Sequence, residues 1–275
     1  MHPQDLLPRF LRDYPFQPAT GVWRAVEIAA VINNGLPTGH GLDVGCGDGL
    51  LTAIIAEHLP GRTWTGIDPD PAEIELALQT KTYDQCIVTG GADIPFSDDS
   101  FDFALSNSVL EHIPDIQPVL NTVSRVLKSG GKFIFTVPSD TFHSALKGPL
   151  LPWISQGKYL SQIDRRCAHL RYWGEKEWEE ALNNANLKII NATPYLNKHQ
   201  VQLWETASRF TAGVLYSLSG GKTQPINIQR RWGLRQAGQR MPTVFVKTLT
   251  RFLSKRITAS DIAPYGCLLI EATKD

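Results

Sequence analysis

The chain alternates short apolar runs with longer segments in which apolar residues recur every three or four positions. The short runs indicate buried strands, and the longer periodic segments indicate helices. The predicted strands are 40–45, 62–68, 84–90, 101–107, 131–138, 187–195 and 266–273. The predicted helices between them are 50–58, 71–80, 115–128 and 174–186. This alternation predicts an α/β fold, with a doubly wound, mostly parallel sheet of seven strands and helices on both faces.

Three stretches lie outside this alternation and define the predicted domain organisation. Residues 1–38 are predicted to form an N-terminal helical cap, followed by one domain over 39–275. Two insertions interrupt that domain, at about 139–173 and 196–263, and both are predicted to be helical lids over a substrate. A pair of glycines, Gly130 and Gly131, is predicted to end the helix over 115–128.

A glycine-rich turn after the first predicted strand is the most informative local feature. Gly45, Gly47 and Gly49 alternate, which lets the backbone pass close under a bulky ligand. The dinucleotide fingerprint is G-x-G-x-x-G, whereas this chain has G-x-G-x-G. Asp43, at the end of the strand, would repel a pyrophosphate and suits an ammonium or sulfonium group. A nicotinamide enzyme is therefore the weaker alternative.

Further acidic residues follow at regular distances along the chain. Asp68 ends the next predicted strand, about twenty residues on, where one carboxylate can accept hydrogen bonds from both hydroxyls of a ribose. Asp93 stands beside the apolar Ile94 within the segment 91–96. The strand over 101–107 then ends at Asn107 and leads into the segment that carries His112.

In order and spacing, these four motifs over residues 40–140 resemble those of the class I S-adenosylmethionine-dependent methyltransferases, of the small-molecule, type 11-like kind. The resemblance implies S-adenosylmethionine as the cofactor and a Rossmann-like sheet whose last strand is antiparallel. It places Asp93 toward the exocyclic amine of adenine and Ile94 against the ring. The cofactor-binding residues that it implies are Asp43, Gly45, Cys46, Gly47, Gly49, Asp68, Pro69, Asp93, Ile94 and Asn107.

A protonated acceptor such as an alcohol needs a general base, and histidine is the usual supplier near neutral pH. His112 is the first candidate because the resemblance places it at the start of a helix facing the methyl group, although a histidine there can equally hydrogen-bond the backbone. His143 is the second candidate, and His169 with Tyr172 the third. Glu111 points to another side of the same helix and is predicted to be structural.

The insertion at 139–173 is rich in aromatic residues and is predicted to choose the acceptor. The residues predicted to contact the substrate are Trp153, Tyr159, His169, Tyr172 and Trp173. Near the ends of the fourth and fifth strands only Asn107 and Asp140 offer metal ligands, so no metal is expected.

Charge is uneven although the net charge is zero. Residues 1–205 contain 16 Lys and Arg against 24 Asp and Glu, whereas residues 206–260 contain 10 Lys and Arg and no acid. Within the basic segment, 242–256 predicts an amphipathic helix. Phe245, Leu249, Phe252 and Leu253 form its apolar face, and Lys247, Arg251 and Lys255 form its basic face. Such a helix can lie among lipid headgroups, or it can pack its apolar face on the protein.

The sequence therefore predicts a methyltransferase that O-methylates a small, apolar or lipid-like acceptor. The alternatives are an RNA methyltransferase that uses the basic segment 206–260, or a non-catalytic binding protein with the same fold; nucleic acid is the less expected partner. Four widely spaced cysteines fit a reducing compartment. There is no run of eighteen apolar residues and no signal-peptide pattern at residues 1–5. A cytoplasmic protein is expected, and peripheral membrane contact through 242–256 is the alternative to packing of that helix on the protein.

Overall fold

The fold is described from a computed structural model of the chain. The structure describes residues 1–211, 240–258 and 261–275, and they form two compact units. The sheet unit comprises Ala30–Asp140, Arg171–Pro194 and Cys267–Asp275. The helical unit comprises the described residues of Met1–Ala29, Thr141–Leu170 and Tyr195–Gly266.

A seven-stranded sheet forms the centre of the sheet unit. Its strands are β1 (Gly39–Val44), β2 (Arg62–Asp68), β3 (Gln85–Val88), β4 (Phe101–Asn107), β5 (Leu127–Pro138), β6 (Leu187–Asn197) and β7 (Tyr265–Lys274). Their order in the sheet is β3-β2-β1-β4-β5-β7-β6. Strands β1 to β5 pair in parallel, whereas β7 runs antiparallel to β5. The predicted mostly parallel sheet with an antiparallel last strand is confirmed.

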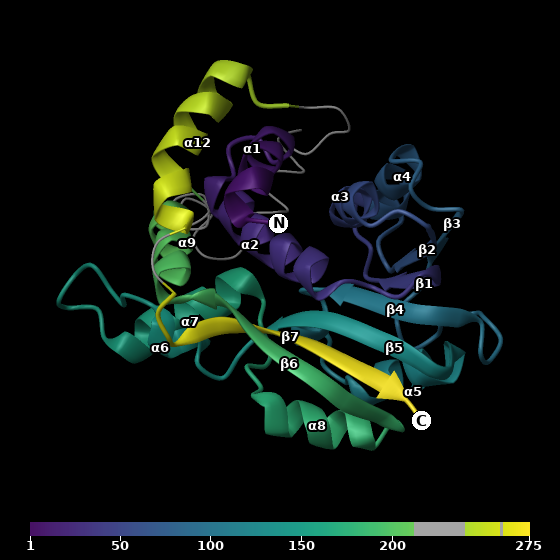
Figure 1. Ribbon diagram of the computed structural model, residues 1–275. Helices are drawn as coiled ribbons and strands as arrows, with labels where there is room; N and C mark the ends of the chain where they lie inside the picture. Colours follow the sequence, from purple (N-terminus) through teal and green to yellow (C-terminus); the bar gives the residue numbers. More distant parts are fainter. Residues whose placement is uncertain (212–239, 259–260) are drawn as a thin grey trace. The chain divides into compact units, whose positions relative to one another are not determined.

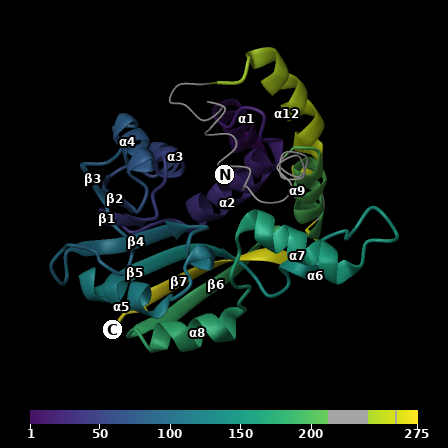
Figure 2. The ribbon, with the colours of Figure 1, turned by 180° about the vertical axis from the view of Figure 1, so that it is seen from behind.

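Helices cover both faces of this sheet. Helices α3 (Leu50–His58) and α4 (Pro71–Gln79) lie on one face, and α5 (Gln117–Val126) and α8 (Glu175–Asn183) lie on the other (Figures 1 and 2). The face under α5 and α8 holds a large apolar core, in which the rings of Phe135 and Trp178 lie 5.0 Å apart. Because β1, β2 and β4 are parallel neighbours, their carboxyl ends meet at one edge, where ligands bind in open α/β sheets.

The helix predicted over 115–128 is too long at its carboxyl end. The helix ends at Val126, and β5 begins at Leu127, which pairs with Phe101. The register shifts after this pair, and Gly130 has a φ of 72° within the strand. The glycine pair therefore shapes an irregular strand and does not end a helix. Leu127 misleads because it is buried and continues the apolar period of α5.

The helical unit is built from α1 (Pro3–Asp13), α6 (Phe142–Ala145), α7 (Gln156–Cys167), α9 (Lys198–Phe210), α12 (Thr243–Ile257) and most of α2 (Pro18–Asn34). Helix α12 packs on α1 and α9, and α6 packs on α9. These helices fall in the stretches that the sequence assigns to the cap and the two insertions, and the domain limit at residue 38 stays a prediction. Among the described residues, no helix is both long enough and apolar enough to cross a membrane.

Candidate functional site

The glycine-rich turn joins β1 to α3 at the carboxyl end of β1. The amides of Gly45 and Cys46 both donate to the Ile67 carbonyl oxygen, at 2.8 and 2.9 Å, which ties the turn to β2. Gly45, Gly47 and Gly49 have positive φ values of 76°, 54° and 75°. Glycine adopts this region of backbone space without steric cost. The alternation in the sequence is therefore a backbone requirement.

The three glycines have different surroundings. A Cβ atom at Gly45 would lie 2.6 Å from the Val109 side chain, and one at Gly49 would lie 2.8 Å from an aromatic ring carbon. Among the described residues, a Cβ atom at Gly47 would meet a single atom within 4 Å, Glu73 Oε2 at 3.8 Å. Packing explains the first and third glycines. Gly47 instead leaves space through which a bulky ligand can approach the backbone.

Asp43 is the penultimate residue of β1, close to the turn, and is buried. Its Oδ2 accepts hydrogen bonds from the Thr52 hydroxyl at 2.5 Å and the Tyr83 hydroxyl at 2.6 Å. Burial raises the pKa of Asp43 to about 6, even though both hydrogen bonds favour the charged form. The sequence analysis missed both partners, which lie 9 and 40 residues away from Asp43 along the chain. The carboxylate is thus held in one position below the turn.

Asp68 ends β2 and supports the turn from the other side. Its Oδ2 accepts from the Gly47 amide at 3.0 Å, and its Oδ1 accepts from the Asp70 amide at 2.9 Å. A carboxylate has about four acceptor positions, so about two are left for other donors, such as the hydroxyls of a ribose. Pro69, which follows, is exposed at this edge.

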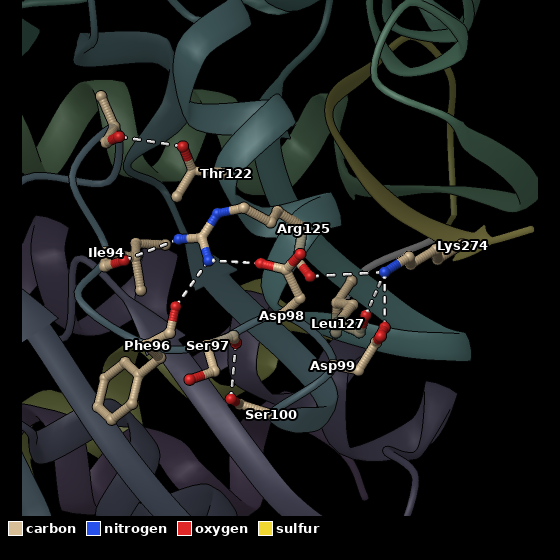
Figure 3. Close-up of polar contacts among 11 residues, drawn as sticks. Ile94, Phe96, Ser97, Asp98, Asp99, Ser100, Thr122, Arg125, Leu127 and Lys274 are labelled. Atoms are coloured by element: carbon tan, nitrogen blue, oxygen red, sulfur yellow. Dashed lines mark hydrogen bonds and ion pairs between the residues drawn. The ribbon is translucent and has the colours of Figure 1, made fainter.

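The segment after β3 carries Asp93, which is exposed, and Ile94, which is 3% exposed and packs in the apolar core. Arg125 of α5 holds this segment (Figure 3). Its guanidinium donates to the carbonyl oxygens of Ile94 at 2.9 Å and Phe96 at 2.6 Å. The same group pairs with Asp98 at 3.0 Å. The contact of Ile94 with an adenine ring stays a prediction, whereas Arg125 is a residue that the sequence analysis missed.

Further contacts in Figure 3 fix the surroundings of this segment. The Thr122 hydroxyl of α5 donates to the Ala92 carbonyl oxygen at 3.0 Å. Lys274 of β7 donates to the Leu127 carbonyl oxygen at 2.6 Å and pairs with Asp99 at 2.8 Å. The segment that carries Asp93 is therefore held by α5, which no local sequence motif indicates.

Asn107 ends β4, the neighbour of β1 in the sheet. Its side chain is buried, and Oδ1 has no hydrogen-bond partner within residues 1–211, 240–258 and 261–275. Nearly all buried polar side-chain atoms are paired, and an unpaired one costs about 1–3 kcal/mol. An orphaned acceptor at the carboxyl edge of the sheet therefore fits a ligand that donates a hydrogen bond there.

His112 lies in η1 (Leu110–His112), the short 3-10 helix that follows β4. Its side chain is 39% exposed, and Nε2 lies 3.8 Å from Oε1 of the buried Glu111. The partly exposed imidazole can meet a substrate. Its role as a base stays a prediction.

Arg171 braces the 3-10 helix that carries His112. Its guanidinium donates to the carbonyl oxygens of Leu110, Ile113 and Pro114, on both sides of the histidine. Burial lowers the pKa of Arg171. The backbone around the predicted base is thus held by a side chain about sixty residues away, a role that the sequence analysis did not assign.

Two of the predicted substrate residues follow Arg171 in the sheet unit. The Arg171 guanidinium lies 5.0 Å from the centre of the Trp173 ring, and the ring of Trp173 packs edge-on against Trp178 at 5.0 Å. Trp173 therefore connects Arg171 to the apolar core. Tyr172, which lies between Arg171 and Trp173 in the sequence, is half-buried.

The other candidates lie in the helical unit. His143 of α6 places Nε2 at 2.8 Å from Asp164 Oδ1 of α7. A carboxylate in this position orients an imidazole, as in catalytic triads, and it also joins the two helices. The amide of His169 donates to the Asp164 carbonyl oxygen at 3.2 Å, and its ring lies 6.1 Å from that of Phe142. Trp153 is 76% exposed.

Tyr159 of α7 takes part in a buried polar network. Its hydroxyl donates to Glu205 of α9 and accepts from Arg209 at 2.9 Å. Glu205, which is fully buried, also accepts from the amides of Lys147 at 2.7 Å and Gly148 at 3.2 Å. Burial and the hydrogen bond to Glu205 raise the pKa of Tyr159 to about 12. The phenol is therefore a neutral hydrogen-bonding group within the helical unit.

The structure thus brings the ten predicted cofactor residues and His112 together in the sheet unit, with Tyr172 and Trp173. It places His143, Trp153, Tyr159 and His169 in the helical unit.

Comparison with known proteins locates the strongest likeness in the region of the glycine-rich turn. The model of the methyltransferase domain family matches residues 42–135. An uncharacterized methyltransferase of Mycobacterium sp. (strain JLS) is 36% identical over 90 residues, which is 33% of this chain and 35% of that protein. Sterol 4-C-methyltransferase strm-1 of Caenorhabditis elegans is 37% identical over 99 residues, which is 34% of this chain and 30% of that protein. The chain spans about a third of the length of these relatives.

Solved structures extend the likeness to the fold. A geranyl diphosphate methyltransferase in complex with GPP and sinefungin superposes with a TM-score of 0.57 at 14% identity, over 90% of this chain and 77% of that chain. Geranyl diphosphate C-methyltransferase from Streptomyces coelicolor A3(2), bound to S-adenosyl-L-homocysteine, gives a TM-score of 0.54 at 14% identity, over 90% and 75% of the two chains. At this identity the likeness shows a shared Rossmann-like fold.

Proposed function

We propose that the chain is a class I S-adenosylmethionine-dependent methyltransferase and that it transfers a methyl group from S-adenosylmethionine to an oxygen of a small, apolar or lipid-like acceptor. The cofactor supplies a methyl group on a sulfonium, which is already an activated leaving group. The protein then has to hold the two reactants in line, because proximity and alignment provide most of the rate in such a displacement.

The observation that carries the proposal is the unused hydrogen-bonding capacity at the carboxyl ends of β1, β2 and β4. Gly47 leaves space beside its backbone, Asp68 has acceptor positions left, and Asn107 has a buried oxygen without a partner among the described residues. Asp68 would bind the ribose and Asp93 the adenine amine. The remaining contacts would come from Asp43, Gly45, Cys46, Gly49, Pro69 and Ile94.

The acceptor proton would pass to a histidine. His112 is the first choice because it follows β4 and its imidazole is partly exposed, and His143 with Asp164 is the second. Trp153, Tyr159, His169, Tyr172 and Trp173 are the proposed acceptor contacts. The names of two relatives, a sterol and a geranyl diphosphate methyltransferase, support an apolar acceptor; both names specify carbon as the methylated atom.

Calorimetry with S-adenosylhomocysteine and NAD tests the cofactor assignment. We expect binding of the first ligand and none of the second. Asp68→Ala removes the acceptor for two ribose hydroxyls and should weaken S-adenosylhomocysteine binding by roughly 2–4 kcal/mol, whereas Asp68→Asn, which keeps one carbonyl acceptor, should lose less. Tight NAD binding without S-adenosylhomocysteine binding would contradict the proposal.

Transfer of label from methyl-labelled S-adenosylmethionine tests the acceptor. The panel contains phenols, quinones, glycolipids and transfer RNA, and the labelled atom is identified by NMR. Label on an oxygen of a phenol or glycolipid is the expected result, and label on carbon would change the reaction type but not the family. Labelled transfer RNA would favour the RNA methyltransferase. Cofactor binding without transfer to any acceptor would favour a non-catalytic binding protein.

A further inference from the structure

Helix α12 has a buried face that belongs to the helical unit. Val246, Leu253 and Ile257 are buried, and the helix packs on α1 and α9. The Gln200 side chain of α9 donates to the Ile257 carbonyl oxygen at 2.8 Å. The sequence analysis placed Leu253 on the same face as Phe245 and Phe252, but Leu253 is 4% exposed and belongs to the packed face. Packing therefore accounts for one side of α12 only.

Outside this packed face, α12 exposes large apolar side chains. Phe245 is 62% exposed, Phe252 is 57% exposed and Val244 is 73% exposed. Residues seven apart in a helix lie on the same side, two turns from each other, so the two phenylalanines form one patch. The guanidinium of Arg256 lies 4.3 Å from the centre of the Phe252 ring. Clustered exposed apolar side chains mark interaction sites more often than scattered ones.

Basic side chains flank this patch. Lys247, Arg251 and Lys255 follow one another at intervals of four residues, so they form a row along the helix, and all three are exposed. No Asp or Glu occurs in Thr243–Ile257 or anywhere in residues 206–260. The exposed side of α12 therefore combines an aromatic patch with a row of positive charges that no acidic residue of the same helix offsets.

We propose that this exposed side of α12 docks on the surface of an anionic lipid bilayer. Phe245 and Phe252 would enter the boundary between headgroups and acyl chains, while Lys247, Arg251 and Lys255 would contact the lipid phosphates. A second copy of the chain is a poorer partner, because a symmetric contact would bring the basic rows together. RNA would satisfy the charges and leave the aliphatic Val244 in water.

Docking would bring the enzyme to the layer in which an apolar acceptor dissolves, but lipid binding does not depend on methyl transfer. It is measured without cofactor or acceptor. Absence of lipid binding would therefore not contradict the proposed methyl transfer. Absence of methyl transfer would likewise not contradict the proposed lipid binding.

Co-sedimentation of the full chain with vesicles tests the proposal. Vesicles of phosphatidylcholine with phosphatidylserine should bind the protein at low salt and release it at high salt, and vesicles of phosphatidylcholine alone should bind it weakly. Lys247→Gln/Arg251→Gln/Lys255→Gln should lower the affinity for the anionic vesicles about a hundredfold.

The phenylalanine variant separates docking from packing. Phe245→Ser/Phe252→Ser should lower vesicle affinity at least about tenfold and leave the melting temperature unchanged, because both side chains are exposed. Phe16→Ser is the matched control: Phe16 is 62% exposed in the same unit but lies outside α12, so vesicle binding should not change.

Three results would overturn the proposal. The first is vesicle binding that both the charge variant and the phenylalanine variant retain. The second is retention of transfer RNA without binding of anionic vesicles. The third is a dimer that dissociates in the phenylalanine variant while vesicle binding stays unchanged. If the phenylalanine variant unfolds, the charge variant decides, and undiminished vesicle binding in it refutes the docking surface.

Discussion

The two units hold their candidate side chains in different ways. At the carboxyl edge of the sheet, counting the described residues, Asp68 supports the turn and keeps acceptor positions, and the side-chain oxygen of Asn107 has no hydrogen-bond partner. In the helical unit, Tyr159 and His143 are bonded to carboxylates of neighbouring helices. The comparison teaches that unused hydrogen-bonding capacity indicates a ligand site more directly than the presence of polar or aromatic residues does.

The largest expected effect concerns the two candidate bases, one in each unit. His112→Ala should lower turnover by about 10²–10⁴ with cofactor affinity little changed, because general base catalysis contributes that much. Protonation of the base lowers activity at acid pH, and this fall should be absent in His112→Ala. Steady-state kinetics against pH measures both effects.

His143→Ala is the matched variant in the helical unit. It removes the hydrogen bond to Asp164 between α6 and α7, and we expect a lower melting temperature with turnover largely kept. A larger loss of turnover in His143→Ala than in His112→Ala would move the base to the helical unit and reverse the comparison.

The second prediction concerns the buried network of the helical unit. Glu205→Ala leaves Arg209 without its buried partner and removes the acceptor of the Tyr159 hydroxyl. Loss of one partner of a buried ion pair lowers the free energy of unfolding by about 3–5 kcal/mol. Urea unfolding measures this, and Glu205→Gln should lose less because it keeps one acceptor oxygen.

The same variants also test whether the polar network of the helical unit affects cofactor binding. S-adenosylhomocysteine affinity of the folded Glu205→Gln protein should equal that of the wild type, because all proposed cofactor residues belong to the sheet unit. If Glu205→Ala is as stable as the wild type, the network does not stabilise the helical unit and the contrast between the units is lost.

The sequence predicts the parts of the site that depend on a few consecutive residues. Gly45, Gly47 and Gly49 are recognisable because each needs a positive φ within one turn, and Asp68 is recognisable because it ends a strand at the expected distance. The central strands β1, β2 and β4 are recognisable because they are mostly buried and apolar on both faces.

The sequence does not predict contacts that only the folded chain creates. The bonds of Tyr83 to Asp43 and of Arg171 to the backbone around His112 join residues 40 to 61 positions apart. No local pattern records such a pair. Leu253 shows the same limit within one helix, because the neighbours that bury it, and not the helical period, decide which apolar residues face inward.

The third prediction uses the titration of Asp43 in the sheet unit. Burial raises its pKa from the ordinary 3.8 to about 6. Between these values the unfolded chain loses the proton while the folded chain keeps it, so the contribution of Asp43 to stability is greatest below pH 4 and falls as the pH rises to 6. At about 1.4 kcal/mol for each unit of difference, the total loss is on the order of 2–3 kcal/mol.

Asp43→Asn isolates this contribution. The difference in unfolding free energy between the variant and the wild type should change by that amount between pH 4 and pH 6, in favour of the variant, and stay constant above. Denaturant unfolding at a series of pH values measures it. A difference that does not vary with pH would mean that Asp43 titrates alike in both states.

The smallest expected effect concerns Arg125. Its substitution tests whether the candidate site in the sheet unit also depends on a charged side chain. Arg125→Ala removes the hydrogen bonds to the carbonyl oxygens of Ile94 and Phe96, so the segment with Asp93 should become less ordered. Because the Arg125 side chain is 38% exposed, water replaces part of the hydrogen bonding that is lost, and we expect S-adenosylhomocysteine to bind about tenfold more weakly.

A second ligand, S-inosylhomocysteine, lacks the adenine amine and separates loss of Asp93 positioning from a general loosening of the segment. If Arg125 positions Asp93, the ratio of the affinity for S-adenosylhomocysteine to that for S-inosylhomocysteine should be smaller in Arg125→Ala than in the wild type. Lys274→Ala is the control, since Lys274 donates to the backbone carbonyl oxygens of Leu127 and Arg125 and pairs with Asp99, but contacts neither the Ile94 nor the Phe96 carbonyl group. An unchanged preference in Arg125→Ala would show that Arg125 supports the fold and not the recognition of adenine.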